Sequence, residues 1–127
     1  MTLSLDTHVF LWWDSQAKRL GRPAKTLISN PSNRVFVSAA SIWEIAIKRR
    51  LGKLAFEGSL VDAVGKNAFL ELQVSGRDCE AGGALDWPHA DPFDRLILAQ
   101  AQARGLTLIT ADAAMRGFIG VAMVAAS

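Results

Sequence analysis

Short apolar runs alternate along the whole chain with longer segments whose apolar residues recur at helical spacing. The short runs predict strands at Thr2–Leu5, Val35–Val37, Leu70–Val74, Leu106–Thr110 and Val121–Val124. The segments between them predict helices at Thr7–Trp13, at Arg22–Ser29, from Ser38 or Ser41 to about Arg50, at Ser59–Asn67, from Ser75 onward, and from Asp91 to Gly105. Strands that alternate with helices in this way are typical of an α/β fold with a mostly parallel sheet and helices on both faces.

The helix that begins at Asp91 has the strongest local signals. Asp91 is a typical N-cap residue, and Pro92 is suited to the first helical position. Asp94 places an acid in the first turn, where the helix dipole favours negative charge. Gly105 is suited to the C-terminal end.

Four acids lie close to the predicted carboxyl ends of strands. Asp6 directly follows the first strand, and Asp112 follows the strand that ends at Thr110. Glu44 lies early in the helix after the second strand, and Asp94 lies in the first turn of the late helix. Ligands of open parallel sheets bind beyond the carboxyl ends of the strands. We therefore expect the fold to bring these four acids together.

Each acid also has an ordinary structural explanation. The two acids of Asp91–Asp94 stabilise a helix N-terminus without any ligand, and Asp112 can cap a following helix. Glu44 can form a capping box with Ser41 or an i,i+4 ion pair with Lys48. These explanations stay open for each acid taken alone.

Several carboxylates in one place repel one another unless a cation lies between them. With one cysteine and two histidines in the chain, the donor set consists of oxygens, which favours a hard ion, Mg²⁺ or Mn²⁺. Such an ion serves phosphoryl chemistry, because it polarises a phosphate oxygen and lowers the pKa of a bound water. The acids therefore predict a metal-dependent reaction at a phosphate ester.

The charge balance supports an anionic partner once the candidate acids are set apart. The chain has 14 lysines and arginines against 12 acids. If Asp91 and the other four acids line one pocket, the remaining surface carries about +7, which suits a nucleic-acid backbone. The densest basic group is Lys48, Arg49, Arg50 and Lys53. Its alternative role is to complement the dipole at a helix C-terminus.

The remaining composition bounds the setting of the protein. A single cysteine, Cys79, allows no intrachain disulfide, and its acidic neighbours argue against a reactive thiolate. No leader-like or membrane-spanning segment is visible, so we expect a soluble cytoplasmic protein that forms one domain over residues 1–127. We expect Trp43, and at least two residues of Phe10–Trp13, to lie in the core.

Four blocks of sequence, in this order, resemble PIN-domain ribonucleases, in particular the VapC-type toxins of bacterial toxin–antitoxin pairs. The blocks are Leu5–His8, Val37–Lys48, His89–Arg95 with Ala99–Ala101, and Leu108–Asp112. The resemblance covers essentially the whole chain. It implies a three-layer α/β/α fold and an endoribonuclease that hydrolyses RNA with a metal-activated water. It also implies a cognate antitoxin partner and a homodimer.

The resemblance also assigns roles to residues. The acidic quartet that it implies for catalysis and for Mg²⁺ or Mn²⁺ falls on Asp6, Glu44, Asp94 and Asp112. We predict that Asp6 and Asp94 are the main ligands, bound directly or through water. Asp91 matches an additional, supporting acid, and Thr7 and Thr110 match hydroxyl positions beside the ligands. The basic group Lys48–Lys53 becomes a candidate RNA contact.

Two alternatives differ from this hypothesis. A metal-free ribonuclease would use His8 and His89 as acid and base, and its activity would survive chelation. A catalytically silent PIN-like module would act only through a protein partner. The presence of all four acids argues against the silent module.

Overall fold

The computed structural model describes residues 1–127 and contains one five-stranded sheet. The strands are β1 Thr2–Leu5, β2 Arg34–Ser38, β3 Leu70–Leu72, β4 Thr107–Thr110 and β5 Met123–Ala125. Their order across the sheet is β3-β2-β1-β4-β5, and every neighbouring pair is parallel. The predicted mostly parallel sheet is therefore confirmed and is parallel throughout.

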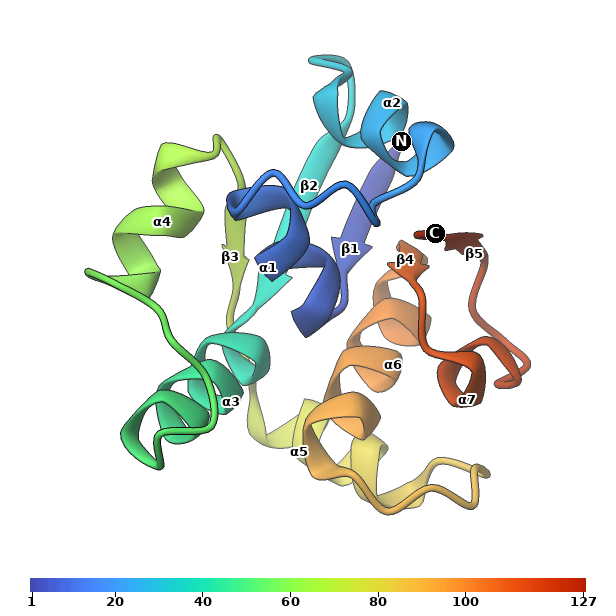
Figure 1. Ribbon diagram of the computed structural model, residues 1–127. Coiled ribbons are helices and arrows are strands. Elements are labelled where there is room, and N and C mark those ends of the chain that lie inside the picture. Colours follow the sequence, from blue (N-terminus) through green and yellow to red (C-terminus); the bar gives the residue numbers. More distant parts are fainter.

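Seven helices surround this sheet (Figure 1). They are α1 Thr7–Asp14, α2 Arg22–Ser29, α3 Ala39–Arg50, α4 Leu60–Lys66, α5 Gly76–Ala84, α6 Pro92–Arg104 and α7 Ala113–Arg116. None of them is long and apolar enough to cross a membrane.

Two hydrophobic clusters cover the two faces of the sheet. Because side chains alternate along a strand, Ile109 and Leu108 of β4 enter different clusters. Ile109 packs in the larger cluster with Leu3 and Leu5 of β1 and with buried residues of α1, α2 and α4. Leu108 packs in the smaller cluster with residues of α6 and α7. The two clusters make this a three-layer α/β/α architecture.

The chain leaves the central strand β1 in one direction and returns on its other side. β2 and β3 extend the sheet on one side of β1, and β4 and β5 extend it on the other. The register pairs Leu5 with both Val37 and Ile109, so the residues that follow these three lie level at one edge. This edge is the position where open α/β sheets bind ligands. Figure 1 shows α3 and the start of α6 beyond the same ends of the strands.

Three sequence-based expectations need correction. The last strand was expected at Val121–Val124 but begins at Met123, because a turn with Gly120 at a φ of 116° precedes it. The third strand ends at Leu72 rather than at Val74. Trp43 is not a core residue: its relative exposure is 60%, because Ile45, two residues along α3, faces the core instead.

Candidate active site

Asp6 lies at the junction of β1 and α1, where it is the N-cap of the helix. Its Oδ1 accepts a hydrogen bond of 2.8 Å from the Val9 backbone N–H, and its Oδ2 accepts one from the Thr110 hydroxyl. The residue is 3% exposed. Burial raises the pKa of Asp6, while these two hydrogen bonds lower it in part. The carboxylate is thus held in place on the central strand but is not neutralised by an ion pair.

Glu44 lies on the buried side of α3 and is held from two directions. The Thr7 hydroxyl donates to Oε1 at 2.7 Å, and the Lys48 ammonium lies 2.8 Å from Oε2. The ion pair with Lys48 was one of the two alternatives for Glu44. The other, a capping box with Ser41, is wrong, because the N-cap of α3 is Ser38.

Asp91 and Asp94 lie at the start of α6. Asp91 is the N-cap, and its Oδ1 accepts from the backbone N–H groups of Phe93 and Asp94 at 2.9 and 3.1 Å. The pKa of Asp94 is raised to about 7, first by burial and then by the charges of four other acids. These acids are Asp91, Glu44, Asp112 and Asp6. The charge of Asp94 is therefore strongly disfavoured, although it occupies a helix first turn.

Asp112 is the N-cap of the short helix α7 and is exposed. Its Oδ1 accepts from the backbone N–H groups of Ala114 and Met115 at 2.8 and 3.3 Å. The Thr110 oxygen accepts from the Asp112 backbone N–H at 3.0 Å, while the Thr110 hydroxyl donates to Asp6. Thr110 therefore fixes Asp6 and Asp112 relative to each other, and the expected structural role of Asp112 as a cap is confirmed.

The start of α6 is anchored by Arg95, the residue after Asp94. Its guanidinium donates five hydrogen bonds, at 2.7 to 3.3 Å, to backbone carbonyls of the preceding segment. The acceptors are Gly82, Gly83, Leu85, Trp87 and His89. No sequence pattern indicates this role, because a segment without secondary structure supplies most of the partners. Arg95 thereby fixes the segment that presents Asp91 and Asp94.

The five acids lie close enough for their negative charges to interact, but their side chains do not form a complete coordination shell. They come from four separate segments, and their charges act together on the pKa of Asp94. No three acidic, histidine or cysteine side chains stand in a metal-binding arrangement as the side chains lie here. Asp6 and Glu44 have protein hydrogen-bond partners instead. The donor chemistry and the unbalanced negative charge fit a divalent cation.

The predicted basic cluster of α3 is partly occupied by structural contacts. Lys48 is paired with Glu44, and Arg49 donates to the carbonyls of Phe56 and Gly58 at 3.3 and 2.8 Å. Arg50 and Lys53 are exposed and make no ion pair. Only half of the cluster is therefore free to attract an anion.

One basic residue that the sequence analysis missed lies beside the acids. A pocket of about 300 Å³ is lined by Asp6, Asp112 and Ala111, and by His8, Trp12 and Arg19. No motif surrounds Arg19, which is in the loop between α1 and α2. His89 is not among the lining residues; its ring lies 4.7 Å from the Trp87 ring. The structure therefore does not place the two histidines in one pocket.

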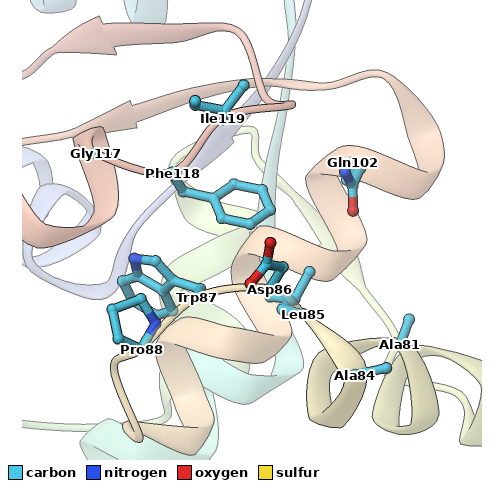
Figure 2. Close-up of a pocket in the computed structure, with 10 residues that line it drawn as sticks. All are labelled: Ala81, Ala84, Leu85, Asp86, Trp87, Pro88, Gln102, Gly117, Phe118 and Ile119. Carbon is cyan, nitrogen blue, oxygen red and sulfur yellow. The ribbon is translucent and has the colours of Figure 1, made fainter.

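A larger pocket, of about 550 Å³, lies on another part of the surface (Figure 2). Figure 2 shows residues from α5, from the segment after it and from the turn after α7, together with Gln102 of α6. Its only acid is Asp86, and none of the five candidate acids lines it. The ring centroids of Trp87 and Phe118 are 6.4 Å apart, and both residues belong to the smaller core cluster. This pocket offers no convergent set of reactive groups.

A third buried carboxylate, Asp78 of α5, has a different environment from Asp6 and Glu44. Arg104 donates to its two oxygens at 3.0 and 3.1 Å, and Gln100 donates to Oδ2 at 3.2 Å. The Ser75 backbone N–H donates as well, which completes a capping box. Burial acts to raise the pKa of Asp78, but these hydrogen bonds together outweigh it and lower the pKa to about 2.

Comparisons with known proteins agree on one family. The family model described as PIN domain matches residues 3–118. A curated relative, Ribonuclease VapC22 of Mycobacterium tuberculosis, is 29% identical over 118 residues, which is 91% of this chain and 90% of the relative.

Solved structures of low sequence identity share the fold. DNA-bound VapBC from Salmonella typhimurium has a TM-score of 0.70 at 17% identity and covers 100% of this chain and 99% of the other. VapBC2 from Rickettsia felis, bound to a DNA fragment from its promoter, has a TM-score of 0.67 at 14% identity, with 100% of both chains covered.

Proposed function

The chain belongs to the PIN-domain family, and from that premise we propose that it is a divalent-metal-dependent endoribonuclease, the toxin of a toxin–antitoxin pair. The observation that carries the proposal is the convergence of acids from four segments. Burial and the charges of these acids raise the pKa of Asp94 to about 7. The similarity to a curated ribonuclease over 91% of the chain supports RNA as the substrate.

The site contains acids that would hold the ion and threonines whose hydroxyls hold two of these acids in place. Asp6, Glu44, Asp94 and Asp112 would provide oxygens to Mg²⁺ or Mn²⁺, with Asp91 adding negative charge. When bound, such an ion polarises a phosphate oxygen and lowers the pKa of water. The supporting hydroxyls are Thr110, which donates to Asp6, and Thr7, which donates to Glu44. These hydrogen bonds orient the two carboxylates.

The test is cleavage of end-labelled RNA by the purified protein with Mg²⁺, with Mn²⁺ and with chelator. We expect cleavage with either ion and none with chelator. Asp6→Asn and Asp94→Asn should remove it, whereas Asp62→Asn, an exposed acid at the start of α4, should cleave like the unmodified protein. Cleavage that survives chelation would favour the two histidines. Complete absence of cleavage together with partner binding would favour the silent module.

We also propose an antitoxin partner, which the VapBC complexes among the similar structures support. The test is co-expression with the product of the neighbouring reading frame. Co-purification of the two chains, with loss of RNA cleavage in the complex, is the expected result. Cleavage that is unchanged in a stable complex would contradict an inhibitory role. The homodimer stays a prediction, and the molar mass of the purified chain tests it.

A further inference from the structure

Arg19 is an exposed cation with its donors unused. Its guanidinium carbon lies 4.8 Å from the centroid of the Trp12 ring, a distance at which the ring face attracts a cation. Arg19 makes no hydrogen bond and no ion pair, although Asp6 and Asp112 line the same pocket. The N–H groups of its planar fork therefore remain available to a ligand.

The pocket combines both signs of charge. Asp6 and Asp112 lie among the acids that suit a divalent ion, while Arg19 adds a positive group to the same 300 Å³. This combination suits a phosphodiester chain, because its phosphates are attracted both to a metal held by carboxylates and to a nearby guanidinium. Arginine in particular matches the paired oxygens of a phosphate.

Trp12 itself is not free to stack on a nucleobase at the face that Arg19 covers. It instead limits the motion of the guanidinium, which lowers the entropy lost when Arg19 binds a ligand. On α3, by contrast, Lys48 and Arg49 already use their donors on Glu44 and on backbone carbonyls. Arg50 and Lys53 are unpaired but do not line the pocket, and Arg19 is the only lysine or arginine that lines it with Asp6 and Asp112.

We propose that Arg19, held by Trp12, binds a phosphate of the RNA chain next to the bond that is cleaved. The inference rests on the proposed function and assigns a substrate contact that the sequence motifs do not include. It also gives Trp12 the role of a positioning residue. RNA would then cross the acids on the side of the α1–α2 loop.

The experiment compares Arg19→Gln with Lys18→Gln. Both variants remove one positive charge from adjacent exposed positions of the same loop, but Lys18 does not line the pocket. We expect Arg19→Gln to raise KM for RNA about tenfold, the effect of losing one charge-assisted hydrogen bond, with kcat nearly unchanged. Lys18→Gln should change KM less than about twofold, because an unpositioned surface charge contributes little. Arg19→Lys, which keeps the charge without the fork, should fall between them.

Binding is measured separately from cleavage, with a fluorescent single-stranded RNA in Ca²⁺ and its integrity checked on a gel. The Kd should rise about as much as KM in Arg19→Gln, and the salt dependence should lose about 0.7 of slope, the value for one phosphate contact. Trp12→Leu should give a smaller rise in Kd. Equal effects of Arg19→Gln and Lys18→Gln, or no effect of either, would overturn the inference.

The outcomes also separate this inference from the proposed function. If the unmodified protein cleaves RNA and Arg19→Gln cleaves it with the same KM, the inference fails and the function stands. If the protein binds RNA through Arg19 and does not cleave it, the proposed function fails. The contact of Arg19 with an RNA phosphate then stands, but its place beside a cleaved bond is overturned. An unmodified protein that binds no RNA overturns both. A variant that weakens only a protein partner's binding would assign Arg19 to that partner and overturn the RNA contact.

Discussion

Asp78 is a buried carboxylate and Asp94 a half-buried one, and their pKa values lie on opposite sides of the ordinary value. Asp78 has a guanidinium, an amide and a backbone N–H as donors, and its pKa is about 2. Asp94 has four other acids around it, and its pKa is about 7. The charge of Asp78 is compensated within the fold, whereas the charge of Asp94 is repelled by the neighbouring acids.

The difference is the one expected between an acid that stabilises the fold, Asp78, and an acid that we propose holds an ion, Asp94. Burying a charge costs free energy unless a partner compensates it, and α5 and α6 provide that partner for Asp78. At the sheet edge Asp6 and Glu44 accept hydrogen bonds, but the only ion-pair partner is the ammonium of Lys48 on Glu44. A fold that keeps such repulsion is suited to an external cation. Perturbed pKa values at converging acids point to a functional site for this reason.

The largest expected effect is on activity. Asp94→Asn removes a charge that has no partner in the fold, so it should lower kcat/KM by about a thousandfold, as does the loss of one electrostatic group in an active site. Asp78→Asn, measured at a temperature where it stays folded, should cleave RNA within about threefold of the unmodified rate, because Asp78 contacts none of the candidate acids. The measurement is the initial rate of RNA cleavage in Mg²⁺. Equal losses in both variants would erase the distinction.

The next effect is on stability, where the change at Asp78 is the one expected to matter. Asp78→Asn leaves Arg104 without its carboxylate and should lower the free energy of unfolding by about 2 kcal/mol, less than for a fully buried pair because Arg104 is partly exposed. Urea denaturation at pH 7.5 measures it. Arg104→Gln is the matched change on the other partner and should cost a similar amount. A stability within 0.5 kcal/mol, roughly the size of an ordinary surface change, would show that the pair does not stabilise the fold.

Local sequence patterns predict most of the helices and strands that carry Asp94 and Asp78. The short apolar runs located all five strands, and Asp91-Pro92 located the start of α6, because these signals lie within a few residues of one another. The four acids were predicted at the correct edge because parallel strands end at the same side of a sheet. Their roles as ligands remain proposals.

Long-range partners were beyond the sequence. Asp78 owes its low pKa partly to Arg104, which is 26 residues away, and no local pattern announces that contact. Arg19 lies in a loop without periodicity, so its place beside Asp6 depends on how α1 packs on the sheet. Trp43 was misplaced because the run Ile42–Ile47 is apolar on more than one helix face, and only the packing of α3 decides which face is buried.

A smaller effect concerns pH. Because the pKa of Asp94 is raised from 3.8 to about 7, the folded protein holds a proton that the unfolded chain has already released. The contribution of Asp94 to stability therefore falls as the pH rises from about 4 to 7. The full shift corresponds to about 4 kcal/mol, and because the side chain is partly exposed we expect about 1 kcal/mol. Thermal unfolding in chelator, across this range, should show the fall in the unmodified protein.

The matched variant and the second acid test the sign. Asp94→Asn should lose this fall in stability and should be the more stable protein above pH 7. Asp78 should act in the opposite sense, since its lowered pKa stabilises the fold above about pH 4, and this stability is lost as the pH falls toward 2. If the unmodified protein gains stability between pH 4 and 7 relative to Asp94→Asn, the charge of Asp94 is compensated in the fold.

The smallest effect tests whether the negative charge of the acids is largely uncompensated, as the comparison of Asp94 with Asp78 implies. Lys48 is the one ammonium bound to the acids, and its pKa is raised by the hydrogen bond to Glu44. Lys48→Met should cost only about 0.5 kcal/mol, the value of a partly exposed i,i+4 pair, yet it should tighten Mn²⁺ binding because an internal competitor is gone. Arg50→Met removes the same charge from the same helix end without a partner acid, so it controls for the general field and should change Mn²⁺ affinity less. Calorimetric titration of both variants decides the matter: if Lys48→Met binds Mn²⁺ more weakly than Arg50→Met, the ammonium orients Glu44 for the ion and does not compete with it.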